Sequence, residues 1–145
     1  MDHYTKGDFQ ITRSIGFFLN RARNTLLMEV DAALQDLGIS GQQMGIVLSL
    51  DRGVAATPYE LSKLLGIDTG LMTRMLDKLE AKGLLARSRS TSDRRVVNLT
   101  LTEKGKAVAE QIPNIVPPVL NARLKDFTQE EFIEFRRLLI EFAGA

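Results

Sequence analysis

At 145 residues the chain is long enough for one domain with its own hydrophobic core, and it carries a net charge of only +1. It has no cysteine and a single histidine, His3, which excludes disulfides, thiolate metal sites and thiol redox sensing and leaves little for catalysis near neutral pH. We therefore expect no metal, no cofactor and no catalytic residue.

Nothing in the chain predicts contact with a membrane. No apolar run approaches the roughly 20 residues that span a bilayer, and the N-terminus lacks the apolar core of a signal peptide. We expect a soluble protein that works in the cytoplasm.

The N-terminal third is predicted to form two helices. Apolar residues recur at helical spacing over residues 8–37, and Gly38 is placed to end this helix. Ser40 and Gln43 have the spacing of a capping box, which predicts a second helix over residues 40–51. Its expected buried stripe consists of Met44, Val47 and Leu48.

A helix-turn-helix is predicted next. Thr57 as a cap, Pro58 in the first turn and Glu60 at the capping-box position start a short helix that ends at Gly66. Its inward positions are Leu61, Leu64 and Leu65. After a tight turn, Asp68 or Thr69 caps a helix that ends at Gly83, with a buried stripe of Met72, Met75, Leu76 and Leu79.

A β-hairpin is predicted to follow this helix pair. Segment 84–90 leads into a polar turn at 91–93, and apolar and polar residues alternate along segment 94–101. The inward-facing residues of the second strand are expected to be Val97, Leu99 and Leu101.

Two further helices complete the expected fold. The first begins at Thr102 and Glu103 and continues to about Ile112. The prolines that follow are expected to kink or interrupt it: Pro113, Pro117 and Pro118. Thr128 and Glu131 form another capping box. The apolar side of this last helix carries Phe132, Phe135, Leu139 and Phe142.

The charges are unevenly distributed along the chain. Residues 82–95 contain five cations and one anion, a net charge of +4, whereas residues 126–145 contain two cations and five anions, a net charge of −3. A helix-turn-helix followed by a cationic hairpin is the winged helix-turn-helix arrangement, in which one helix fits the major groove and the ribbon follows the backbone or the minor groove. Double-stranded DNA is therefore the predicted partner.

The second helix of the pair is the predicted reading element. Arg74 has the reach for a bidentate contact with guanine, Thr73 can meet a thymine methyl or a phosphate, and Gly70 allows the helix N-terminus close to the backbone. The residues predicted to contact DNA on this helix are Thr69, Gly70, Thr73, Arg74 and Lys78. Asp77 is either a solvent-facing residue or a partner for a hairpin arginine.

The hairpin supplies the second group of predicted DNA contacts: Arg87, Arg89, Asp93, Arg94 and Arg95. For Arg87 and Arg89 the alternative is the solvated face of a strand with no role in binding.

Residues 60–105, ELSKLLGIDTGLMTRMLDKLEAKGLLARSRSTSDRRVVNLTLTEKG, resemble the core of the multiple antibiotic resistance regulator (MarR) family. That family has an Asp-x-Arg wing followed by Leu-Thr, a pattern matched here by Asp93, Arg95, Leu101 and Thr102. Flanking helices of suitable length extend the resemblance over nearly the whole chain.

The resemblance implies a homodimeric bacterial transcription factor, usually a repressor, whose terminal helices intertwine and whose DNA affinity is lowered by a small, often aromatic or anionic ligand. It also implies that Arg94 or Arg95 enters the minor groove and that Asp93 braces nearby basic side chains. Redox-sensing members need a cysteine near the N-terminal helix, so that branch is excluded.

The expected fold class is mainly α with a small β-hairpin wing, in one domain of residues 1–145. Residues 40–102 would form the DNA-binding lobe, and residues 1–37 and 103–145 the dimerisation arm. Both ends carry more apolar surface than three small helices can cover, at Phe9, Phe17, Phe18, Ile115, Val116, Val119, Phe132, Phe135 and Phe142. The alternative is that these side chains pack within one subunit.

A two-fold dimer would place two recognition helices about one turn of DNA apart, which predicts a pseudo-palindromic operator. A ligand pocket is expected between the arm and the DNA-binding lobe, with candidate residues Arg21, Arg23, Met44 and Tyr59. For Arg21 and Arg23 the alternative is a salt bridge between helices.

Two other function classes remain open at this stage. The first is a winged-helix module that binds protein and has no DNA function. The second is an enzyme, which is disfavoured because the chain has no cysteine, no internal histidine and no phosphate-binding loop.

Overall fold

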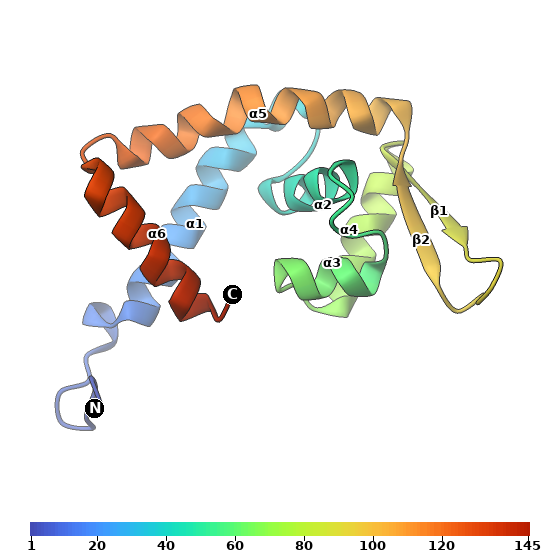
Figure 1. Ribbon diagram of the computed structural model, residues 1–145. Coiled ribbons are helices and arrows are strands. Elements are labelled where there is room, and N and C mark those ends of the chain that lie inside the picture. Colours follow the sequence, from blue (N-terminus) through green and yellow to red (C-terminus); the bar gives the residue numbers. More distant parts are fainter.

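The computed structural model describes residues 1–145 as a mainly helical chain with one antiparallel hairpin, which confirms the expected winged-helix class (Figure 1). Short 3-10 turns lie at Ile11–Arg13 and Gln35–Leu37. The regular elements are α1 (Ile15–Ala33), α2 (Gly41–Asp51), α3 (Pro58–Leu65), α4 (Thr69–Ala81), β1 (Leu85–Arg89), β2 (Val97–Leu101), α5 (Glu103–Leu124) and α6 (Gln129–Ala143).

The first helix is shorter than its apolar periodicity predicts. Ser14 ends the preceding 3-10 turn and caps α1, because its hydroxyl accepts a hydrogen bond from the Phe17 amide at 3.1 Å and donates to the Ile11 carbonyl at 2.8 Å. The expectation of a helix from residue 8 was therefore wrong. At the other end, Gly38 adopts φ 72° and closes the turn after α1, as expected.

The capping box of α2 is confirmed. The Ser40 hydroxyl accepts from the Gln43 amide at 3.2 Å, and the Gln43 side-chain oxygen accepts from the Ser40 amide at 3.1 Å. Of the three residues predicted as the buried stripe only Val47 is fully buried, and Ile46 is buried beside it.

The helix-turn-helix forms between α3 and α4. Asp68, and not Thr69, caps α4 by accepting from the Leu71 amide at 3.0 Å, and all four predicted stripe residues of this helix are buried. In α3 the capping box is incomplete, because the Thr57 hydroxyl donates to the Glu60 carboxylate. Leu64 is 54% exposed, so its assignment to the core was wrong.

The wing is attached to the core through β2. The two strands pair with Leu85 opposite Leu101 and Arg89 opposite Val97. Leu99 is 3% exposed, and its amide donates to the Ala56 carbonyl at 2.8 Å. The predicted alternation is confirmed, and it fixes which side of the ribbon faces the core.

The prolines were expected to kink or interrupt α5; because the helix runs from Glu103 to Leu124, the expected interruption was wrong. Each proline lacks the amide that would bond four residues back. The three rings lie on exposed positions, and two of the freed carbonyls belong to the exposed residues Pro113 and Asn114, where water can donate to them.

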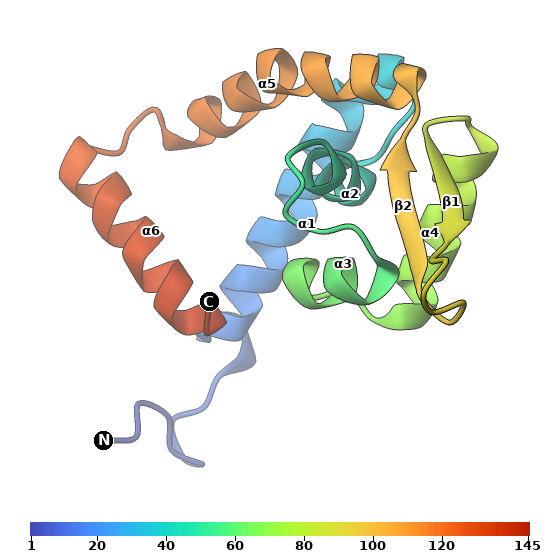
Figure 2. The ribbon, with the colours of Figure 1, turned by 45° about the vertical axis from the view of Figure 1, so that its right-hand side comes forward.

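The hydrophobic core lies in the winged-helix lobe and under the first half of α5, where Ile112 is 1% exposed. By contrast, none of the residues of α6 is buried. Figures 1 and 2 show α6 turning back from the end of α5 toward the start of α1. No helix has the length and apolarity required to cross a membrane.

Gly105 lies where the wing base packs against α5 with no space for a side chain, so Gly105→Ala is expected to destabilise the fold. A Cβ there would lie 2.0 Å from the Leu84 carbonyl oxygen and 3.2 Å from a Leu101 methyl carbon. We expect the free energy of unfolding in urea to fall by about 2 kcal/mol. Gly7→Ala, where nothing lies within 4 Å, is the control. Equal stability of the two variants would show that the wing base does not pack this closely.

Candidate nucleic-acid interface

The outward face of α4 presents the predicted reading residues to solvent. Arg74 is exposed and makes no hydrogen bond or ion pair within the chain. Its guanidinium lies beside Gly70, where an added Cβ would make an ordinary van der Waals contact of 3.7 Å with Nη1 of Arg74. The Thr73 hydroxyl donates to the Thr69 carbonyl at 2.9 Å, which leaves its lone pairs and methyl group free. An uncommitted guanidinium on an exposed helix face can make a bidentate contact with a base.

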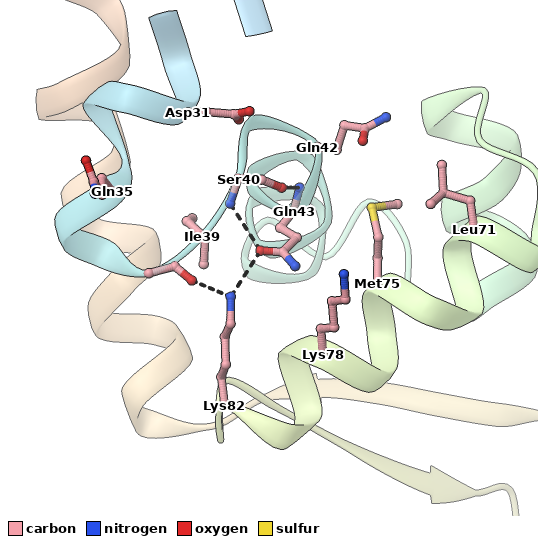
Figure 3. A pocket seen from close by; sticks show the side chains of 11 residues that line it. Asp31, Gln35, Ile39, Ser40, Gln42, Gln43, Leu71, Met75, Lys78 and Lys82 are labelled. Carbon is pink, nitrogen blue, oxygen red and sulfur yellow. Dashed lines mark hydrogen bonds between the residues drawn. The ribbon is translucent and has the colours of Figure 1, made fainter. Parts of the chain in front are cut away.

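Lys78 is also exposed, and it follows Arg74 by one helical turn on α4. Figure 3 shows its amine directed toward α2, in a pocket shared with Met75 and Leu71. Of these two predicted residues, Lys78 lines this pocket and Arg74 does not.

Arg87 joins the wing to the recognition helix. Its guanidinium lies 2.9 Å from the Asp77 carboxylate and 3.0 Å from the Glu80 carboxylate, and its amide donates to Glu80 at 3.3 Å. The Arg87 side chain is only 25% exposed. Of the alternatives raised for Asp77, the pairing with a wing arginine is the one observed. These contacts hold strand β1 against α4.

The wing tip is held by its own side chains. Arg89 donates from Nη1 to the Arg94 carbonyl at 2.8 Å. The Asp93 carboxylate accepts from Nε and Nη2 of Arg95 at 3.1 and 3.2 Å, and from the Arg95 amide at 3.0 Å. The expected bracing by Asp93 thus has a specific partner in the structure, Arg95.

These hydrogen bonds from the Arg95 side chain and amide lower the pKa of Asp93 below its ordinary value. Because the pKa of Asp93 is lowered in the folded chain, the ion pair contributes its full stabilisation at pH values above the ordinary pKa of an aspartate. This stabilisation is lost as the pH falls through the lowered pKa. The tip is therefore braced throughout the neutral range.

The two adjacent arginines of the tip differ in their contacts. Arg94 is exposed and its guanidinium has no partner within the chain. Arg95 is 90% exposed even though Asp93 holds it, and its Nη1 remains free. Both guanidinium groups are available to an anionic partner, and that of Arg95 is already oriented by Asp93.

A pocket of about 510 Å³ lies between the start of α2 and the side of α4 (Figure 3). Its polar groups include the amines of Lys78 and Lys82 and the side chain of Gln43, and its apolar wall includes Leu71 and Met75. The residues proposed from sequence for a ligand do not line this pocket.

Those four candidates are not brought together in the chain. Arg21 lies in a shallow groove on α1, Met44 packs against the core, and Tyr59 on α3 is exposed with the Lys63 amine 5.1 Å from its ring centre. Neither Arg21 nor Arg23 forms an ion pair. The ion pair that does join α1 to another helix links Glu29 to Arg123 of α5 at 2.6 Å, a contact across 94 residues that local patterns do not reveal.

An apolar surface lies between α1 and α6. A hollow of about 690 Å³ is lined there almost entirely by apolar side chains, among them Ile15, Phe18, Leu19, Ala22, Phe135, Leu138, Leu139 and Phe142. Phe18 is 56% exposed and Phe142 is 65% exposed in the single chain. Apolar surface of this extent marks a protein contact more often than a solvated face.

The protein-family model described as MarR family matches residues 39–97 of this chain. The multiple antibiotic resistance protein MarR of Escherichia coli is 35% identical over 122 residues, which are 83% of this chain and 83% of that protein. A structure of mutant MarR from E. coli, complexed with operator DNA, superimposes with a TM-score of 0.79 and 32% identity over 88% of this chain and 92% of that one.

Two other proteins are similar over most of their length. The transcriptional repressor MdtR of Bacillus subtilis is 25% identical over 136 residues, covering 94% of this chain and 88% of that protein. BpsR of Bordetella bronchiseptica, whose DNA binding is described as regulated by 6-hydroxynicotinic acid, has a TM-score of 0.84 at 24% identity over 96% of this chain and 99% of that chain. At that identity the likeness to BpsR shows the shared fold.

Proposed function

The chain belongs to the MarR family of DNA-binding transcriptional repressors, which are not enzymes, and from this premise we propose how it binds its operator. Two copies of the chain form a dimer that presents two α4 helices and two wings to a pseudo-palindromic site. In each copy Arg74 reads bases in the major groove, while the wing tip follows the backbone and the minor groove.

One observation carries this proposal: the exposed Arg74 has no protein partner, and its helix is joined through Asp77 and Arg87 to the wing that carries the braced cationic tip. Thr69, Gly70 and Thr73 lie on the exposed side of the same helix and supply close backbone approach and phosphate contacts. Arg87 supports this surface through Asp77 and does not need to touch DNA.

The two tip arginines have distinct roles in the proposal. Arg95 enters the minor groove, because Asp93 orients its guanidinium and leaves Nη1 free, whereas Arg94 contacts phosphate. Arg95→Ala is expected to weaken binding to all sequences about uniformly and to reduce the salt dependence by about one counterion. Gel shifts of specific and random duplexes at several salt concentrations measure both quantities.

Separate substitutions test this assignment. Asp93→Asn leaves both arginines in place but removes the ionic brace, so it should reduce affinity in the wild-type protein and have no further effect in the Arg95→Ala background. A full effect of Asp93→Asn when Arg95 is absent would mean that Asp93 does not act through Arg95.

We further propose that a small aromatic or anionic molecule releases the operator by favouring a spacing of the two lobes that does not fit DNA. The regulation described for BpsR supports this kind of response. The pocket of Figure 3 is a candidate site, since it combines two amines with an apolar wall and adjoins α4. Of the sequence-predicted ligand residues, Arg21, Arg23, Met44 and Tyr59 remain candidates only if the second subunit completes a site around them.

The test of DNA binding as such is a gel shift against random duplex at several salt concentrations. A repressor that neutralises phosphates binds more weakly as salt rises. A winged-helix module that binds only protein would give no shift, or a weak one without salt dependence, and that result would overturn the proposal.

A further inference from the structure

Lys82 lies at the C-cap of the recognition helix and connects it to two other parts of the chain. Its amine donates to the Gly38 carbonyl and lies 3.5 Å from the side-chain oxygen of Gln43. Its own carbonyl accepts from the Lys104 amine at 3.0 Å, at the start of α5. Figure 3 shows the Lys82 side chain extending from the end of α4 to these acceptors beside α2.

The two acceptors are themselves fixed in place. Gly38 closes the turn after α1 in the left-handed conformation. Gln43 is 6% exposed, and the oxygen that faces Lys82 also accepts from the Ser40 amide at 3.1 Å. The neighbouring Gly41 amide donates to the Asp31 carboxylate of α1 at 2.6 Å. The Lys82 amine therefore ends on the junction where α1 meets α2.

Lys82 is not placed to contact DNA from the outward face of α4. It follows Arg74 by eight residues, about 12 Å along the helix axis. Its ammonium protons are directed at a carbonyl and an amide oxygen of the protein. Lys82 instead links the end of α4 to the junction of α1 and α2 and to the start of α5.

We propose that Lys82 is a positioning residue for operator binding, which holds α4 at a fixed angle to α1 and α5. This inference rests on the proposed dimeric function, because the angle matters only where two reading helices must match two half-sites at once. A loosened α4 would still recognise a half-site but would lose affinity for a correctly spaced pair.

The test uses the full-length protein and an operator obtained by selection from random duplex. Lys82→Met keeps the apolar stem and removes the donors. It is expected to weaken binding to that operator about tenfold, as loss of a charge-assisted hydrogen bond typically does. Lys82→Arg, which restores the donors, should recover most of the affinity. The control is Lys106→Met, because Lys106 pairs only with Glu103 at 3.4 Å and loses the same charge.

Two readouts separate positioning from simple charge loss. The slope of log affinity against log salt should be the same for Lys82→Met and the wild type, whereas a lost phosphate contact lowers it by about 0.9. Operators with one base pair added between the half-sites should be penalised less in Lys82→Met than in the wild type.

The inference is wrong if Lys82→Met binds like the wild type, if it lowers the salt slope, or if its spacing preference is unchanged. If the methionine variant does not fold, the same measurements are made on Lys82→Gln, whose shorter side chain cannot reach both acceptors. The same results would then support or overturn the inference. A wild-type protein that selects no operator would instead overturn the proposed function, and this inference with it.

Discussion

Leu139→Asp is expected to convert the protein into a monomer of about 16.2 kDa that binds its operator at least a hundredfold more weakly. Leu139 is 37% exposed and lies in the apolar surface between α1 and α6. A carboxylate buried there by a second chain would lack a partner and would oppose association by several kcal/mol. A monomer presents one recognition helix in place of two. Sedimentation velocity and a gel shift on the selected operator measure the two effects.

Gln129→Asp is the matched control for this prediction. It places the same side chain at the exposed start of α6, away from the apolar hollow. The control should remain dimeric with unchanged DNA affinity. Should Leu139→Asp also sediment as a dimer, or should the wild type itself be monomeric at micromolar concentration, the proposed arm is not the dimer contact.

Arg74→Ala is expected to weaken binding to the selected operator by about 1 to 3 kcal/mol and to relax the base preference at one position in each half-site. The reason is the free guanidinium on the outward face of α4, which has no structural contact to lose. Thermal stability should therefore not change. Competition gel shifts with operators substituted at single base pairs give the affinity and the preference together.

Arg136→Ala on α6 controls for loss of one positive charge, since Arg136 is exposed and forms no ion pair. Arg74→Ala should differ from Arg95→Ala in kind: the first alters sequence preference, the second lowers affinity for every sequence. Equal loss of specificity in both variants would refute this division between reading helix and wing.

The parts of the fold that depend on neighbouring residues could be predicted from the sequence. The capping boxes at Ser40 and Thr128 and the left-handed glycine at Gly66 form as expected, because each needs only residues within one helical turn. The buried stripe of α4 was also predictable, since Met72, Met75, Leu76 and Leu79 repeat at helical spacing.

Other features depend on packing that local patterns do not contain. Leu64 has helical spacing, but no element of the same chain covers it. The prolines of α5 are compatible with a continuous helix because their rings lie on exposed positions. Helix α1 begins after Ser14 because the Ser14 side chain caps it there. The apolar periodicity of residues 8–37 does not indicate this cap.

The sequence allowed candidate residues for DNA binding to be named, but it did not reveal the contacts that these residues make with one another. The sequence indicates that Arg87 and Arg95 belong to the wing, yet their partners Asp77 and Asp93 were only alternatives or implied by resemblance. The hydrogen bond of Lys82 could not be predicted, because its acceptor Gly38 lies 44 residues earlier. Contacts across such separations are set by the packed core and become visible only in the folded chain.

Selection of bound sequences from a random duplex pool, followed by sequencing, tests the central claim most directly. Two reading helices on a symmetric dimer predict an enriched pseudo-palindrome whose half-site centres are about 10 base pairs, or one helical turn, apart. Enrichment of a single unpaired half-site, or no enrichment over the starting pool, would contradict the account.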